Sequence, residues 1–165
     1  MRNIVVFDLD NTLSDARHRN HLVPKPEDAS KCLAWEAHYS AAGEDAPIQD
    51  NIDLLNRLAG GDTFIVVLTG RCELAKWLTI SWLERHGVSY DKLIMRPYDD
   101  ERPDTLYKEE ELLNLGLDNI LCCFDDLEHV AEMIRGLGVT CHLVTKHTER
   151  LVSTTDNSEW GKLDG

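Results

Sequence analysis

The chain lacks the features of a membrane, secreted or zinc-stabilised protein. No apolar run approaches the roughly 20 residues that span a bilayer. The run after Met1 meets Asp8 too soon to form a signal peptide. The cysteines number 5, an odd count, and no two of them have zinc-finger spacing. Cys122 and Cys123 are adjacent in an apolar run, which is typical of small buried thiols. These features together fit a reducing compartment, so we expect a cytoplasmic protein without membrane contact.

Positive charge is also scarce. The sequence has 17 Lys and Arg against 30 Asp and Glu, a formal net charge of −13. A chain this acidic is not expected to hold nucleic acid by broad neutralisation of phosphates, which still leaves recognition of one phosphate end open. The same acidity suits a site that uses a divalent cation.

The hydrophobic pattern alternates between two periods. Short runs rich in β-branched residues predict five strands, at residues 4–9, 63–69, 92–95, 119–124 and 139–144. Helical spacing predicts helices at residues 51–58, 72–86, 104–115 and 127–137. This alternation predicts an α/β fold, a Rossmann-like three-layer sandwich with a central parallel sheet.

Two of these helices carry more detailed expectations. Asp104 is expected to cap the helix at residues 104–115, and Gly116 is expected to end it. The helix at residues 72–86 is expected to present one apolar face, formed by Leu74, Trp77, Leu78 and Trp82. We expect both tryptophans to pack in the core rather than to stack on a ligand.

The domain organisation follows from the same pattern. We expect one domain over residues 1–147 and a loosely held polar tail at 148–165. Residues 14–47 are too few for a full second domain and predict a small helical insertion over the site. This insertion contains a short basic cluster, in which Arg17 is a candidate phosphate contact. The alternative is that the cluster is a solvated face.

Asp8 and Asp10 follow directly on the first predicted strand. Residues two apart on an extended strand point to the same side, so these carboxylates lie close together. Like charges at that range raise a pKa or require a cation. Reading them as simple turn residues is disfavoured, because unpaired carboxylates beside a buried strand are costly. The pair therefore indicates a metal-dependent site.

Other polar residues follow the second and fourth strands. The carboxyl ends of parallel strands gather at one edge of a sheet, which is where ligands bind in open α/β folds. We therefore expect Thr69, Arg71, Asp125 and Asp126 to meet the first pair of aspartates there. Each has a simpler reading: Thr69 as a strand-end residue, Arg71 as a surface residue, and the two aspartates as helix caps.

Roles in phosphoryl chemistry can be assigned to these positions. Asp8 can attack phosphorus, and Asp10 can protonate the leaving oxygen and then take a proton from water. Thr69 and the amides around Gly70 can bind phosphate oxygens. Lys108 can neutralise both nucleophile and phosphoryl group, although it can also be read as a solvated helix lysine.

The same aspartates can bind a metal ion. A hard divalent cation such as Mg²⁺ takes oxygen ligands. We expect Mg²⁺ to be held by Asp8, the backbone carbonyl of Asp10, Asp125 and Asp126, where it would offset the repulsion between a carboxylate and an anionic substrate.

Four segments together resemble the motifs of the haloacid dehalogenase (HAD) superfamily of phosphotransferases: Asp8-Leu9-Asp10-Asn11-Thr12, Leu68-Thr69-Gly70-Arg71, Lys108 and Phe124-Asp125-Asp126. A narrower resemblance, to the 3′-phosphatase domain of phage polynucleotide kinases and its bacterial relatives, rests on further segments: Met95-Arg96-Pro97, Arg102-Pro103-Asp104, Lys108-Glu109-Glu110, Val130, Met133 and Gly138-Val139-Thr140-Cys141. Asn11 stands where that family often has glycine.

The resemblance implies a Mg²⁺-dependent phosphomonoesterase that acts through an aspartyl-phosphate on 3′-phosphates of nucleic acid ends or nucleotides. It also implies substrate contacts at Thr12, Gly70 and Arg71, and a host cytoplasm if the gene is phage-borne. A GxxxxGK[ST] nucleotide-binding loop is absent from the sequence, so no kinase half is expected, and no obligate protein partner is evident. The alternatives are a nucleotidase, a small-molecule phosphatase or a non-catalytic phosphate-binding module. The last is disfavoured, because each catalytic position holds a competent side chain.

Overall fold

The computed structural model describes residues 2–144. Its central sheet has the strand order β5-β4-β1-β6-β7, and every neighbouring pair is parallel. The strands are β1 (Ile4–Phe7), β4 (Phe64–Cys72), β5 (Lys92–Arg96), β6 (Ile120–Asp125) and β7 (Cys141–Leu143). The predicted α/β fold with a parallel central sheet is confirmed. The polar tail expected at residues 148–165 lies outside the described residues.

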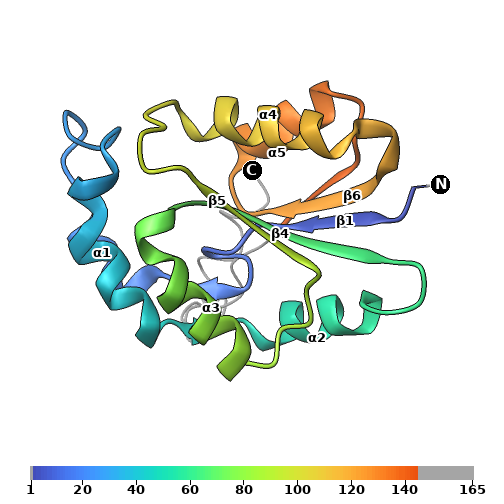
Figure 1. The fold of residues 1–165 in the computed structure, drawn as a ribbon, viewed down its shortest axis with the longest axis horizontal. Helices are drawn as coiled ribbons and strands as arrows, with labels where there is room; N and C mark the ends of the chain where they lie inside the picture. The colour runs from blue at the N-terminus through green and yellow to red at the C-terminus, as the bar shows by residue number, and fades with distance from the viewer. Residues whose placement is uncertain (1, 145–165) are drawn as a thin grey trace, which may run out of the picture.

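Helices cover both faces of this sheet (Figure 1). The helices α2 (Gln49–Leu58) and α3 (Lys76–Arg85) pack on one face, and α4 (Asp104–Leu115) and α5 (Glu128–Gly136) on the other. None of the described helices is long and apolar enough to cross a membrane.

The central strand β1 is buried from both sides. Val5 and Phe7 belong to the core that includes Trp82 of α3, whereas Val6 belongs to the core that includes Leu112 of α4. This alternation is the pleat of a strand with two buried faces. Each large apolar side chain buried there stabilises the fold by about 1.5–3 kcal/mol. The strand end that precedes Asp8 is therefore held rigidly.

The insertion leaves the sheet just after β1 and returns just before α2. Its base is a short antiparallel pair in which Ser14 of β2 (Ser14–Asp15) faces Pro47 of β3 (Ala46–Pro47). Between them lie four short helical segments: η1 (Arg17–Leu22), η2 (Cys32–Trp35), α1 (Glu36–Ser40) and η3 (Ala41–Glu44). Figure 1 shows α1 beyond the end of the sheet at which β1 stops, away from the N-terminus.

Three expectations about local structure are corrected. Helix α4 begins at Asp104 and makes no side-chain cap there, because the Asp104 carboxylate pairs with Arg96 and Lys108 instead. Strand β4 continues to Cys72 and is followed by a 3-10 turn, η4 (Glu73–Ala75), so the next helix begins later than predicted. Trp77 and Trp82 are five residues apart on α3, about 140° around an α-helix, so they cannot share one face. Trp82 is fully buried, whereas Trp77 is 78% exposed.

Candidate active site

A tight turn after β1 positions the first two aspartates. The Leu9 carbonyl accepts the backbone N–H groups of Thr12, Leu13 and Ser14. Asn11 has φ 61°, in the left-handed region that glycine adopts freely and asparagine tolerates. Its side-chain oxygen also accepts the N–H of Ala16 at 3.2 Å. Asparagine can therefore replace the glycine that the family often carries at this position.

Asp8 is held from three directions. Its backbone N–H donates to the Phe124 carbonyl of β6 at 2.9 Å. One carboxylate oxygen accepts the Thr12 hydroxyl at 3.2 Å, and the other accepts Lys108 Nζ at 2.9 Å. Thr12 is fully buried behind Asp8 and lies outside the cavity lining described below. The structure therefore gives Thr12 an orienting contact to Asp8, and direct substrate contact by Thr12 stays a prediction.

Lys108 links Asp8, just after β1, to Asp125 at the end of β6. Its ammonium donates to Asp125 Oδ2 at 2.8 Å and lies 3.6 Å from Asp104 Oδ2. Burial raises the pKa of Asp8 well above its usual range; Lys108 opposes that rise, while Asp125 and Asp126 add to it. Burial would lower the pKa of Lys108, but the surrounding carboxylates outweigh it and raise that pKa. One ammonium does not balance this much negative charge, so the cluster attracts a further cation.

Three carboxylates meet the requirement of a hard cation. Oxygen atoms of Asp8, Asp125 and Asp126 all lie within 4.8 Å of one another, with Asp8 and Asp125 buried. Oxygen ligands at this range suit Mg²⁺, which keeps several of its waters and takes few protein ligands. The donor set fits the ion. The backbone carbonyl of Asp10 as a further ligand stays a prediction.

The side chain of Asp10 is bound by two arginines. Arg71 Nη2 donates to Asp10 Oδ1 at 2.7 Å, and Arg19 donates to the same oxygen. Both guanidinium groups also pair with Asp45, which is 2% exposed. Burial would raise the pKa of Asp10, but Arg71 and Arg19 outweigh it and hold that pKa well below its usual range. In this arrangement Asp10 is an ionised carboxylate, the form that takes a proton from water.

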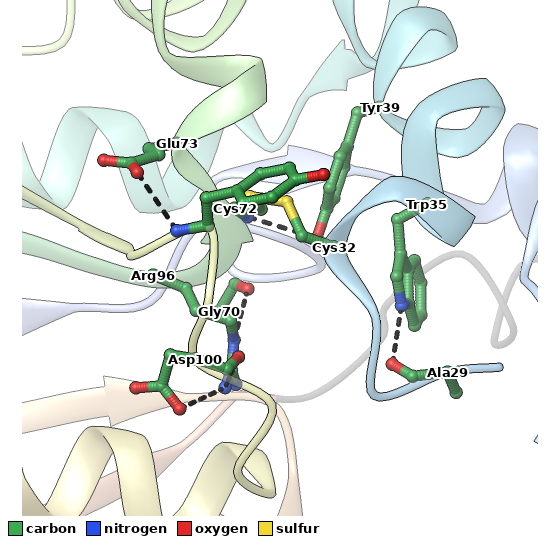
Figure 2. The surroundings of a disulfide bond; sticks show 10 residues. Ala29, Cys32, Trp35, Tyr39, Gly70, Cys72, Glu73, Arg96 and Asp100 are labelled. Carbon is green, nitrogen blue, oxygen red and sulfur yellow. Dashed lines mark hydrogen bonds and ion pairs between the residues drawn. A yellow bond between two sulfur atoms is a disulfide. The ribbon is translucent and has the colours of Figure 1, made fainter.

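Gly70 allows the third segment to approach closely. Thr69 is buried, and its hydroxyl accepts the N–H of Arg71 at 3.1 Å. A Cβ on Gly70 would collide with the Asp104 carboxylate. Arg96 Nη2 donates to that same carboxylate at 2.8 Å. Figure 2 shows Arg96 beside Gly70, whose carbonyl accepts the Arg96 Nε–H at 3.1 Å. The glycine therefore lets the segment before α4 pack directly on the end of β4.

A cavity of about 570 Å³ opens over these groups. The predicted residues that line it are Asp8, Asp10, Thr69, Gly70, Arg71, Lys108 and Asp126. The insertion, the segment that leads into α4 and the turns after β1 and β6 complete the wall with these residues: Asn11, Ala16, Asn20, Val23, Ala29, Ser30, Cys32, Trp35, His38, Tyr39, Arg96, Glu101, Arg102, Pro103, Asp104 and Leu127. The structure thus brings residues of three predicted segments and Lys108 into one cleft.

The basic cluster expected in the insertion includes both Arg17 and Arg19, and the structure gives the two residues different roles, whereas Asp45 was not expected at the site. Arg17, the candidate phosphate contact, lies outside the cavity lining and pairs with Asp15. Its role in substrate binding stays a prediction. Arg19 and Asp45 instead form the buried network around Asp10. The three-residue spacing of Ala16 and Arg19, which matches one turn of a 3-10 segment, was a usable signal for the burial of Arg19. No sequence pattern indicated the burial of Asp45.

A disulfide joins the insertion to the end of β4. Cys32 of η2 and Cys72 of β4 are bonded, with Cα atoms 5.8 Å apart (Figure 2). The expectation of free thiols does not hold for this pair, although it does for Cys122, Cys123 and Cys141. A separation of 40 residues carries no sequence signal for pairing, because only the fold brings the two chains together. The cellular compartment stays a prediction.

Comparison with solved structures defines the class of fold. A haloacid dehalogenase-like hydrolase, SP0104 from Streptococcus pneumoniae, superposes with a TM-score of 0.64 at 16% identity over 87% of this chain and 84% of that one. A HAD family enzyme of Bacteroides thetaiotaomicron, solved with magnesium and inorganic phosphate, gives 0.56 at 11% identity over 88% of this chain and 95% of that one. The fold is that of the HAD hydrolases.

A narrower similarity identifies the family. The sequence profile of the polynucleotide kinase PNKP phosphatase domain matches residues 2–148, and the chain belongs to that family. A chain of the Pnkp1/Rnl/Hen1 RNA repair complex superposes with a TM-score of 0.71 at 25% identity, over 87% of this chain. The protein spans only 42% of that chain. A search of curated proteins finds no match.

Proposed function

We propose that the protein is a Mg²⁺-dependent phosphomonoesterase that removes 3′-phosphates from nucleic acid ends or nucleotides through an aspartyl-phosphate. The observation that carries the proposal is that Asp8, Lys108 and Asp126 line one cavity, while the buried Asp125 lies next to them and accepts a hydrogen bond from Lys108. Membership of the PNKP phosphatase family supports the choice of a 3′-phosphate ester over other phosphate esters.

Each residue takes one part in the reaction. The Asp8 carboxylate attacks phosphorus while the bond from phosphorus to the leaving oxygen breaks, and that oxygen receives the proton that Asp10 took from water in the preceding turnover. Water then attacks phosphorus, Asp10 takes a proton from that water, the bond from phosphorus to the Asp8 oxygen breaks, and inorganic phosphate leaves. Lys108 neutralises the nucleophile and the phosphoryl oxygens. A Mg²⁺ ion held by Asp8, Asp125 and Asp126 would offset the remaining negative charge.

Hydrolysis of p-nitrophenyl phosphate tests the proposal. With Mg²⁺ the wild-type protein is expected to release p-nitrophenolate, and EDTA is expected to abolish its release. Asp8→Asn removes the nucleophilic charge at constant shape, so turnover should fall to below about one thousandth, as losses of catalytic nucleophiles do. Asp53→Asn, an exposed carboxylate on α2, is the matched control and should keep full activity. Wild-type turnover by folded Asp8→Asn would refute the mechanism, and no hydrolysis by the wild type would refute the function.

A further inference from the structure

The cavity extends well beyond the catalytic floor. Its volume of about 570 Å³ is typical of a pocket for an entire small ligand rather than for a phosphate alone. Away from Asp8 and Asp10, the wall on the insertion side carries Val23, Trp35 and Tyr39. A phosphate ester with its phosphorus at Asp8 therefore has room for its leaving group against this wall.

The indole ring of Trp35 is fixed in that wall. Its Nε1–H donates to the Ala29 carbonyl at 2.8 Å (Figure 2). The Tyr39 ring lies 6.0 Å away at an interplanar angle of 21°, and the His38 ring meets Trp35 edge-on at 5.0 Å. A ring ordered in advance loses little entropy when a ligand binds. Aromatic faces of this kind are stacking platforms for nucleobases.

Two bonds fix the wall relative to the catalytic strand. The disulfide ties Cys32 to Cys72, and the Tyr39 hydroxyl oxygen accepts the N–H of Cys72 at 3.1 Å. Cys72 directly follows the Gly70-Arg71 segment of the site. Figure 2 shows the disulfide joining the segment that carries Trp35 and Tyr39 to the end of β4. The distance between the indole and the phosphoryl position is therefore set by the fold.

The basic side chains of the cavity do not form a continuous binding track for a nucleic acid strand. Among the described residues, the Arg and Lys side chains that line it are Arg71, Arg96, Arg102 and Lys108. Each of these is already paired with at least two carboxylates. Single-stranded nucleic acid gains affinity by placing successive phosphates on cations that lack such partners. The net charge of −13 works against such gains.

Resting on the proposed phosphatase activity, we propose that the site binds one nucleoside 3′-phosphate unit, free or at a strand end. The base of that unit stacks on Trp35, and nucleotides further along the strand add nothing to recognition. The ligand class is thus a single terminal nucleotide.

Two substrates that differ only in the base test the stacking. Thymidine 3′-phosphate is compared with 1,2-dideoxyribose 3-phosphate, which lacks the base, by release of inorganic phosphate. The wild type is expected to favour the nucleotide in kcat/KM by about tenfold, within the range that base stacking gives. Trp35→Ala should lose most of this preference, Trp35→Phe should restore part of it, and Trp77→Ala, an exposed tryptophan outside the cavity lining, should keep it.

The same assay separates this inference from the proposed function. Phosphate release from both compounds at equal wild-type rates would refute the stacking role and leave the phosphatase standing. No release from either compound would overturn both. A preference that survives in Trp35→Ala, or that disappears in Trp77→Ala, would place the base elsewhere and refute the assignment.

Chain length and salt test the restriction to one nucleotide. The substrates are 3′-phosphorylated oligothymidylates of one, three and ten nucleotides, at low and at high salt. The values of kcat/KM are expected to agree within about threefold and to show the same salt dependence, because no added phosphate contact releases counterions. A rise of more than about tenfold with length, lost at high salt, would reveal a polymer track and refute the restriction.

Discussion

Arg17 and Arg19 stand two residues apart and occupy opposite environments. Arg19 is fully buried, whereas the Arg17 side chain is 40% exposed and pairs with Asp15. The segment η1 is a 3-10 helix with three residues per turn, so Ala16 and Arg19 share its inner side. Burial of an arginine is tolerable here because Asp10 and Asp45 both accept its hydrogen bonds.

Substitution of each arginine by glutamine tests this difference. Arg19→Gln leaves Asp45 and Asp10 short of a counterion, so we expect a loss of roughly 3 kcal/mol in the free energy of unfolding. We also expect a large fall in turnover, because Asp10 loses one of the two arginines that bind its carboxylate. Arg17→Gln should change stability by less than about 1 kcal/mol, as exposed pairs do. Urea denaturation and steady-state phosphatase assays measure both effects.

The pair of variants also decides the candidate role of Arg17. A selective rise in KM for Arg17→Gln, with stability unchanged, would support a substrate contact by that residue. Equal stability of the two variants would show that the buried network around Asp10 contributes less than its geometry suggests.

At the level of elements, the insertion is attached to the sheet by the Cys32–Cys72 disulfide. Between its base and η2 the insertion includes residues 23–31, which are mostly exposed and contact little. Two of them, Ala29 and Ser30, nevertheless line the cavity. The disulfide fixes the end of this stretch next to β4, where Cys32 and Tyr39 of the insertion form a small buried cluster with Cys72 and Ala75.

Reduction of this disulfide is expected to destabilise the protein measurably. It closes a loop with a sequence separation of 40 residues. Removing a cross-link of that length costs up to about 4 kcal/mol by chain entropy. Dithiothreitol supplies two electrons and two protons and is itself oxidised to a cyclic disulfide. We therefore expect a lower midpoint of urea unfolding in its presence.

Two cysteine variants show whether this change belongs to the Cys32–Cys72 bond. Cys32→Ser should unfold at the lower urea midpoint, and dithiothreitol should not change that midpoint. Cys122→Ser, which replaces a half-buried free thiol on β6, should respond to dithiothreitol as the wild type does. An unchanged wild-type midpoint under reduction would refute the stabilising role of the bond.

For the whole molecule, His38 links the stability of the fold to pH. Burial, and after it the neighbouring Arg19, lower the pKa of His38 to about 4, although Asp10 and Asp45 oppose the shift. Above pH 6.5, the ordinary value for histidine, the side chain is neutral in both folded and unfolded states. Between pH 6.5 and 4 the unfolded chain binds a proton that the folded protein excludes. The free energy of unfolding therefore falls as pH is lowered through this window.

The measurement is the midpoint of urea unfolding at several pH values from 7 to 4.5. His38→Gln should flatten part of the decline, because glutamine does not titrate. His21→Gln replaces an exposed histidine in the same insertion and should leave the decline as it is in the wild type. Parallel curves for the wild type and His38→Gln would refute the link.

Much of the fold could be predicted because its strands are buried on both faces. The run at β1 reads as continuous apolar residues for that reason, and the helix at residues 104–115 was predicted with its observed bounds. Prediction failed where the period was too short to detect. The two-residue strands β2 and β3 carry no pattern, and Trp77 was assigned to the face of Trp82 although a spacing of five residues places the two on different sides of α3.

The site was predictable where neighbouring residues carried the signal. Asp8 and Asp10 share one turn, and the chemistry of two adjacent carboxylates points to a cation. Arg19 and Asp45 pair across 26 residues, so each alone reads as a surface charge. Their burial becomes understandable only when the fold supplies the partner. The disulfide escaped prediction for the same reason.

The narrow base of the insertion has a consequence for redesign. Since Asp15 and Ala46 sit opposite each other in the β2–β3 pair, the polypeptide departs and returns at nearly one point. Everything between them is a cassette that can be exchanged without altering the register of the parallel strands. Arg19 and Asp45 belong to this cassette, however, and hold the catalytic Asp10. An insertion taken from another protein must therefore contain a basic residue that pairs with Asp10. Without one, we expect the chimeric protein to have the new specificity but no turnover.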